Sequence, residues 1–191
     1  GAIDGLSDAK LEGANFTGSM IIGHQTTGTL DAAEKNTAVG ISSLDAITTG
    51  DENTAIGNNS LTSNTTGVTN TASGYASLQF NTTGNSNTAS GAITLKANTT
   101  GSNNTASGYA SLQINTTGSK NTASGVTSLQ NNTTGVTNTA SGYGSLQQNT
   151  TGNSNTALGD QAGDVITTGS NNVLIGKGTN PSANNATNQI V

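Results

Sequence analysis

Apolar, small and polar residues follow one another along this chain in a fixed order with a 17-residue period. Each unit opens with Asn-Thr-Ala, carries a single large apolar residue near its middle, and closes with Asn-Thr-Thr-Gly and two variable residues. Strict self-similarity at a short period is typical of solenoids, in which each unit buries its apolar side only against its neighbours. The Asn-Thr-Ala triplets begin at Asn36, Asn53, Asn70, Asn87, Asn104, Asn121, Asn138 and Asn155.

The columns of the repeat predict what each position does. Two glycines per unit indicate two corners of a coil, because glycine supplies backbone angles that are closed to other residues. The first glycine column runs from Gly23 to Gly176 and includes Gly40, Gly57, Gly74, Gly91, Gly108, Gly125, Gly142 and Gly159. Leucine, the large apolar residue that recurs at a fixed position in most units, is expected to fill the interior. It stands at Leu44, Leu61, Leu78, Leu95, Leu112, Leu129 and Leu146.

Three further columns consist of small or polar residues. Alanine, the third residue of the triplet, is expected where two layers or two chains approach closely. The Asn column from Asn36 to Asn172 is expected to stack as an amide ladder between rungs. The second Asn, before Thr-Thr-Gly, is interpreted as turn chemistry, since Asn tolerates the left-handed backbone region.

Helices are excluded by the dominance of Gly, Asn and Thr, which are poor helix formers. The short segments with Thr, Val and Ile suit strands. We therefore predict an all-β fold: a parallel β-solenoid of about ten 17-residue rungs, each with two short strands and two tight corners. Strands stack ~4.8 Å apart, so ten rungs would make a rod roughly 48 Å long.

The repeat divides the chain into three parts. Residues 1–18 lie outside the pattern and are expected to cap or link the first rung. Residues 19–176 are the repeats, and residues 177–191 are expected to form a terminal turn. The last residues resemble the start of another strand, so we expect the chain to be a fragment of a longer protein.

Composition separates this chain from both globular and disordered proteins. Only 30% of its residues are hydrophobic, 3% are aromatic and 8% are charged, whereas a globular domain has ~45–50% apolar and ~25% charged residues. Disorder also requires a high net charge, but here the net charge is only −5 and the pattern is strict. One leucine per unit can hardly offset an ordering cost of ~1.5 kcal/mol per residue, so we expect the chain to self-associate.

The residues that would carry catalysis or metal binding are scarce. There is no cysteine, and His24 is the only histidine, so we predict no catalytic residues, no metal and no cofactor. Acidic residues pair loosely as Asp31 with Glu34, Asp51 with Glu52, and Asp160 with Asp164, and are interpreted as exposed corner charges. Calcium at Asp51 and Glu52 is the open alternative, because hard oxygen ligands suit that ion.

Lysine is equally scarce, and no long apolar run is present. The five basic residues are all lysine, so we expect no nucleic-acid binding. The apolar runs are too short for membrane insertion. The position before the first glycine changes from apolar at both ends to serine in five central units. Those serines are expected either to face water or to bond to one another.

Tyr75, Tyr109 and Tyr143 are spaced two repeat units apart, which places them on alternate rungs along one edge. Tyrosine gives amphipathic contacts at low entropic cost, so this stripe is a candidate contact surface for a glycan or a protein. Packing over the corner is the alternative.

The units Asn-Thr-Ala-Val-Gly at 36–40 and Asn-Thr-Ala-Ile-Gly at 53–57, separated by Leu and Thr-Thr-Gly, resemble the head repeats of YadA-type trimeric autotransporter adhesins. They are still more similar to repeats of phage tail-fibre and tail-spike proteins, and residues 6–10 and 22–30 resemble their flanks. The resemblance implies a left-handed β-roll in a side-by-side homotrimer on a virion or cell surface. The general rule for parallel crossovers favours a right-handed coil, so handedness stays open. The unit length and the serine column depart from the adhesin pattern.

These observations favour a non-enzymatic fibre segment of a phage tail fibre or similar appendage. It would serve as a rigid spacer that also contacts a receptor, either a host-surface glycan or a protein. The first alternative is a bacterial trimeric adhesin head. The second is an ice-binding solenoid, since the Thr column from Thr37 to Thr156 is regular, although an ice-binding face usually has two such columns side by side.

Overall fold

A computed structural model describes residues 9–11, 20–22 and 33–191 of the chain, and within them every regular element is a strand of three residues. The fold is a parallel β-solenoid, as the repeat predicts. The strands are β1 (Ala9–Leu11), β2 (Met20–Ile22), β3 (Thr37–Val39), β4 (Thr54–Ile56), β5 (Thr71–Ser73), β6 (Thr88–Ser90), β7 (Thr105–Ser107), β8 (Thr122–Ser124), β9 (Thr139–Ser141), β10 (Thr156–Leu158) and β11 (Val173–Ile175).

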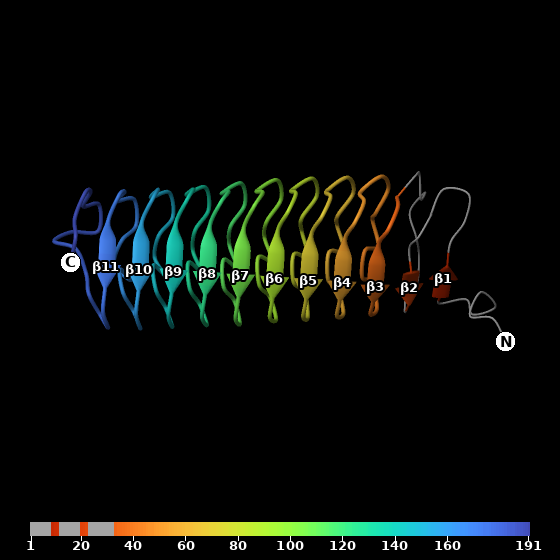
Figure 1. Ribbon diagram of the computed structural model, residues 1–191, viewed down its shortest axis with the longest axis horizontal. Helices are drawn as coiled ribbons and strands as arrows, with labels where there is room; N and C mark the ends of the chain where they lie inside the picture. Colours follow the sequence, from red (N-terminus) through yellow and green to blue (C-terminus); the bar gives the residue numbers. More distant parts are fainter. Residues whose placement is uncertain (1–8, 12–19, 23–32) are drawn as a thin grey trace.

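All eleven strands form one sheet in which the spatial order is the sequence order (Figure 1). From β2 onward the neighbours are parallel, and their register pairs each residue with its equivalent in the next repeat unit, as Thr105 pairs with Thr122. The nine strands from β3 to β11 are therefore joined by eight turns, each one repeat unit long. This constant register converts each column of the sequence into a straight row of side chains along the rod.

Both ends of the sheet carry additional pairing. Strand β1 runs antiparallel to β2, so these residues of the expected N-terminal cap cover the hydrogen-bonding edge of the first rung. At the other end, Val173 donates its backbone N–H to Gln189, and Ile190 forms a parallel bridge with Val173. The last residues thus begin another strand, as their sequence indicates, and residues 177–188 complete the turn before it.

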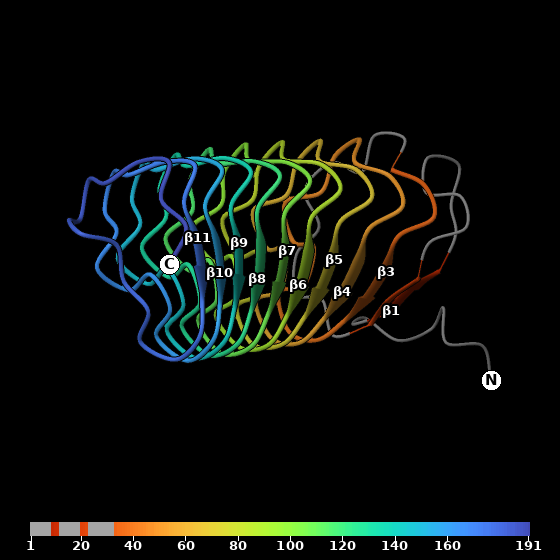
Figure 2. The same ribbon diagram turned by 60° about the vertical axis from the view of Figure 1, so that its left-hand side comes forward.

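The expectation of two strands per rung is wrong, because each rung between residues 33 and 191 contains one. The remainder of each turn is irregular coil that closes the solenoid behind the sheet (Figure 2). It is nevertheless hydrogen-bonded from rung to rung, as Leu112 N–H donates to Ser128 at 3.0 Å and Thr116 N–H donates to Thr133 at 2.9 Å. Left-handed residues interrupt a second strand: Ala110 has φ of 57° and Leu112 has φ of 49°.

Leucine fills the interior, as predicted, and each member of that column from Leu44 to Leu146 is fully buried. Alanine also points inward: Ala106 and its equivalents are buried in the same core. The alanine column therefore cannot contact a neighbouring chain, which removes one of its two expected roles. Alanine is small enough to let the sheet approach the opposite wall of its own coil.

The predicted amide ladder is present and buried. Asn104 Nδ2 donates to Asn87 Oδ1 at 3.1 Å and to the carbonyl of Gly118 at 2.9 Å. The backbone N–H of Asn104 donates to the same Oδ1 of Asn87 at 3.0 Å. An unpaired buried polar group costs about 1–3 kcal/mol, so these bonds make a polar interior tolerable.

The second Asn column, from Asn64 to Asn149, forms another buried ladder, here called the inner ladder, which the interpretation as turn chemistry missed. Asn98 Nδ2 donates to Asn81 Oδ1 at 2.6 Å and to Gly101 at 2.9 Å, the second bond closing the local turn. Ile47 and Ile166 hold the equivalent buried positions in the rungs that flank this ladder. Two amide ladders and the leucine column therefore share the core.

The first glycine of each unit is required by contact between rungs as well as by its backbone angle. Gly108 has φ of 122°, and a Cβ atom on it would lie 2.6 Å from the carbonyl oxygen of Gly125. The corners predicted from glycine are thus also the places where successive turns pack backbone against backbone.

Candidate binding surface

The outer face of the sheet carries two columns of side chains. Successive residues of a strand point to opposite faces, and here the central alanine is buried while its two neighbours face outward, as in β7. The first outward column is threonine in β3 to β10, and the second contains the residue before the corner glycine. Since alanine faces the core, only these two columns of the sheet are available to a partner.

The second outward column changes character along the rod. Five central rungs expose serine, which decides between the two alternatives that the sequence left open in favour of serines that face outward; they are Ser73, Ser90, Ser107, Ser124 and Ser141. The flanking rungs expose large apolar residues instead: Val39 and Ile56 near one end, Leu158 and Ile175 near the other, with exposed fractions from 39% to 60%. Val39 pairs with Ile56 and Leu158 with Ile175, so each pair forms a small apolar patch.

The three tyrosines occupy one column just beyond the corner glycine. Thr127 N–H donates to the carbonyl of Tyr109, and equivalent bonds at Tyr75 and Tyr143 keep this column in register. The three side chains are exposed to nearly the same extent, 56%, 56% and 57%. Ala92 and Val126 occupy the same column on the rungs between them. The structure therefore places the tyrosines in the predicted stripe on alternate rungs.

The three tyrosines lie on three of the five rungs that expose serine. Each tyrosine follows a serine after the corner glycine, as in Ser107, Gly108 and Tyr109. The phenol hydroxyls make no hydrogen bond to other residues in the part of the chain that the structure describes. We call the three tyrosines and the five central serines the tyrosine–serine surface.

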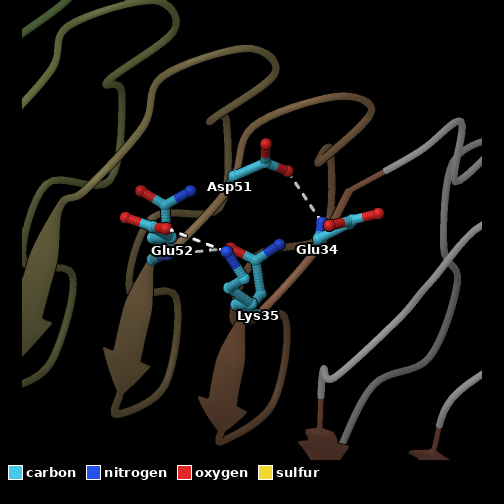
Figure 3. A network of polar contacts seen from close by, with 6 residues as sticks. Glu34, Lys35, Asp51 and Glu52 are labelled. Atoms are coloured by element: carbon cyan, nitrogen blue, oxygen red, sulfur yellow. Dashed lines mark hydrogen bonds and ion pairs between the residues drawn. The ribbon is translucent and has the colours of Figure 1, made fainter.

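The acidic residues near the start of the described coil are engaged with their neighbours (Figure 3). Asp51 accepts the backbone N–H of Glu34 at 2.7 Å, and Lys35 Nζ lies 3.3 Å from Glu52 Oε1. Both bonds join one rung to the next. The lysine supplies the counter-charge beside Glu52, which weakens the hypothesis of calcium at this corner.

The acidic pair of Asp160 and Asp164 is divided between two contacts. Asp160 forms an ion pair with Lys177 at 3.2 Å, and Asp164 accepts a hydrogen bond from Asn180 Nδ2 at 2.8 Å. Among residues 9–11, 20–22 and 33–191, no group of three or more His, Cys, Asp or Glu could hold a metal ion. His24 and Asp31 lie outside the described residues.

Two exposed features escaped the sequence analysis. Gln130 Nε2 donates to Gln113 Oε1 at 2.9 Å, and Gln147 donates to Gln130 in the same way, which makes a third, partly exposed amide ladder. Phe80 and Ile114 are exposed on the rungs of Tyr75 and Tyr109. They too are spaced two repeat units apart, and a search for that period would have revealed them.

The structure defines the chain as a parallel β-solenoid with a regular exposed surface. Comparison with known proteins identifies no relative: no protein-family model, curated protein or solved structure matches the chain. A helix with the length and hydrophobicity of a membrane span does not occur among the described residues.

Proposed function

We propose that this chain is a non-enzymatic fibre segment of a phage tail fibre or a similar surface appendage, in which it acts as a rigid spacer. The observation that carries the proposal is the buried ladder from Asn36 to Asn172, which joins every rung between them. A spacer must transmit position over its whole length, and a continuous hydrogen-bonded stack provides that property. A bacterial adhesin head would use the same geometry, and the resemblance of the repeat supports both.

Stiffness in this rod comes from three kinds of bond between successive rungs. The sheet contributes its ladder, the coil contributes backbone bonds such as Leu95 N–H to Ser111, and the interior contributes the two Asn ladders. Bending the rod in any direction would strain some of these bonds, because they lie on the sheet, in the coil and in the interior. Regular turns with few long loops also give proteases little extended backbone to bind.

The fibre is proposed to be a homotrimer. The apolar patches on the outer face, Val39 with Ile56 and Leu158 with Ile175, are large side chains that lack cover in a single chain. Burying these side chains between copies would add buried apolar surface, of which the small core of a single chain has little. The threefold arrangement rests on the resemblance of the repeat to trimeric fibres.

Light scattering on a sizing column tests the trimer. The expected mass is three times 18.7 kDa. The double variant Ile56→Asp with Leu158→Asp should dissociate into folded monomers, because each patch would receive a charge. Thr83→Asp, a change of an exposed residue in the turn outside the sheet, is the matched control and should leave the mass unchanged. A folded wild-type monomer would contradict the trimer.

Ice binding is a second candidate, supported by one observation. In β5 to β9 the outer face presents threonine and serine side by side, which are two parallel columns of hydroxyl groups at the rung spacing. A regular, flat hydroxyl lattice is the feature expected of a surface that orders water. Thermal hysteresis measures this directly: a freezing point depressed below the melting point would favour ice binding, and coincident values would eliminate it.

A further inference from the structure

Large and small side chains alternate from rung to rung along the tyrosine column. Tyr75, Tyr109 and Tyr143 are separated by Ala92 and Val126, so each short side chain stands between two exposed rings. At ~4.8 Å per rung, neighbouring tyrosines are about 9.6 Å apart, and all three span about 19 Å. The surface therefore repeats with a two-rung period, although the backbone repeats with every rung.

A ligand that matches such a surface has a repeat of its own. Tyrosines two rungs apart would contact every second ring of an extended ligand whose units are each about as long as one rung, ~4.8 Å. Two pyranose rings linked in an extended chain cover nearly the same length as two rungs. A polysaccharide with a two-sugar repeat could thus present the same face to each tyrosine in turn.

The chemistry around the tyrosines suits a neutral, hydroxylated ligand. Serine and tyrosine hydroxyls both donate and accept hydrogen bonds, as sugar hydroxyls require. From Asn53 to Gly159 the sequence has no acidic residue, and its only charged residues are Lys96 and Lys120. Lys96 Nζ lies 5.8 Å from the centre of the Phe80 ring. Both residues belong to columns of the repeat other than the tyrosine column. Charge therefore contributes little to recognition on these rungs.

We infer that the tyrosine–serine surface binds an extended, uncharged polysaccharide, one disaccharide for each two-rung interval, with the sugar rings packed against Tyr75, Tyr109 and Tyr143. The inference goes beyond the proposed spacer, because it gives the same rod a surface that contacts a receptor. The apolar patches proposed to join copies lie on the rungs outside this surface. A second copy of the chain, whose period is the same, is the competing occupant that the test must separate.

The experiment uses the neutral, extended β-1,4-linked probes cellohexaose, chitohexaose and mannohexaose, with the coiled maltohexaose as the control sugar. The chain has three tyrosines and no tryptophan, so its tyrosine fluorescence reports on the proposed site alone. At least one extended probe should change that fluorescence in a saturable manner, and maltohexaose should not. If none of the three extended probes binds, the inference is wrong.

Two sets of variants locate the site by titration calorimetry. Tyr109→Ala removes the ring shared by both intervals and should weaken binding about tenfold, more than Tyr143→Ala, which removes one interval. The pair Tyr109→Val with Val126→Tyr keeps the composition but changes the spacing to three rungs and one, and it should also lose about tenfold. Phe80→Ala with Ile114→Ala, exposed residues of another column on two of the same rungs, should bind like the wild type.

Light scattering on the same samples separates the proposal of a fibre spacer from the inference of a polysaccharide-binding surface. If the rod keeps its mass while every extended probe fails to bind, the polysaccharide inference falls and the spacer remains. If the spacing variant binds as well as the wild type, the two-rung match is wrong. If Tyr109→Ala lowers the mass of the assembly, a second copy covers the tyrosines, and the inference is overturned in favour of an interface.

Discussion

The side-chain oxygen Oδ1 of Asn149 is buried without a hydrogen-bond partner among the described residues, because Ile166 occupies the same position one rung further along. On the preceding rung, Asn132 Oδ1 accepts a bond from Asn149 Nδ2 at 2.8 Å. The inner ladder therefore has its unpaired acceptor at one end only. The ladder oxygens from Asn64 to Asn132 each accept a hydrogen bond. The free-energy cost of an unpaired buried oxygen therefore falls on Asn149 at the end of the ladder.

This asymmetry predicts different effects for one substitution at two sites. Asn98→Ile would leave Asn81 Oδ1 without its donor while the unpaired oxygen of Asn149 remains, so we expect a loss of about 1–3 kcal/mol in the free energy of unfolding. Asn149→Ile would free Asn132 Oδ1 but remove the existing unpaired oxygen, so the change should be below about 1 kcal/mol. Ile47 and Ile166 show that isoleucine fits this position in other rungs.

Urea denaturation of both variants measures the difference. Equal losses at Asn98 and Asn149 would show that the amide at each rung contributes through its own turn alone, through bonds such as Asn98 Nδ2 to Gly101. The stacking between rungs would then add nothing to stability.

Glycine to alanine changes should separate backbone contact from backbone angle. At Gly108 a Cβ atom would lie 2.6 Å from the carbonyl of Gly125, and the φ of 122° disfavours alanine as well. We expect Gly108→Ala to cost at least about 3 kcal/mol. Gly178 has φ of 62° but nothing within 4 Å of an added Cβ atom, so Gly178→Ala should cost only about 1–2 kcal/mol. Thermal unfolding distinguishes the two, and a mild effect at Gly108 would mean that the rungs can separate.

Much of the fold could be predicted because the constant columns have few alternatives. Leucine is the large apolar residue that recurs at one fixed position of the units, as at Leu112, and such a column is expected to fill the interior. An Asn repeated as regularly as Asn104 can stack on its neighbours. The inner ladder escaped prediction because Asn98 stands before Thr-Thr-Gly, where its local pattern is that of a turn. Its burial comes from other rungs, and a local pattern contains no information about them.

Two further features could not be derived from residue types. Leucine is not a residue that favours positive φ, yet Leu112 adopts 49°, and every leucine of the column from Leu44 to Leu146 lies between 48° and 52°. The sequence also does not determine which column faces outward. Ala106 and Ser107 are successive strand residues and point to opposite faces whichever of the two faces is buried. The tyrosine stripe was predictable, because a spacing of two repeat units is two rungs whichever face is buried.

The left-handed positions between the corner and the leucine predict a gain in stability. Thr127 has φ of 55°, and threonine disfavours that region, whereas Asn59, the equivalent residue four rungs earlier, suits it. Thr127→Asn should therefore raise the free energy of unfolding by about 0.5–1 kcal/mol. Thr134→Asn, on an exposed residue without a positive φ, is the matched control. A similar gain at both sites in urea denaturation would assign the effect to composition, not to backbone angle.

Whole units should be removable, because each rung contacts only its neighbours. Deleting residues 87–120, which are two complete units, joins Ser86 to Asn121 and restores both Asn ladders, with Asn121 next to Asn70 and Asn132 next to Asn81. The product should remain folded and be shorter by about 9.6 Å. Deleting residues 87–119 removes nearly the same length but shifts every later column by one position, so that Lys120 takes the position of a ladder Asn, and this variant should unfold. Small-angle X-ray scattering measures the length and urea denaturation the stability. If the two deletions are equally disruptive, the rungs are not interchangeable and the rod is a single cooperative unit with no modular spacer.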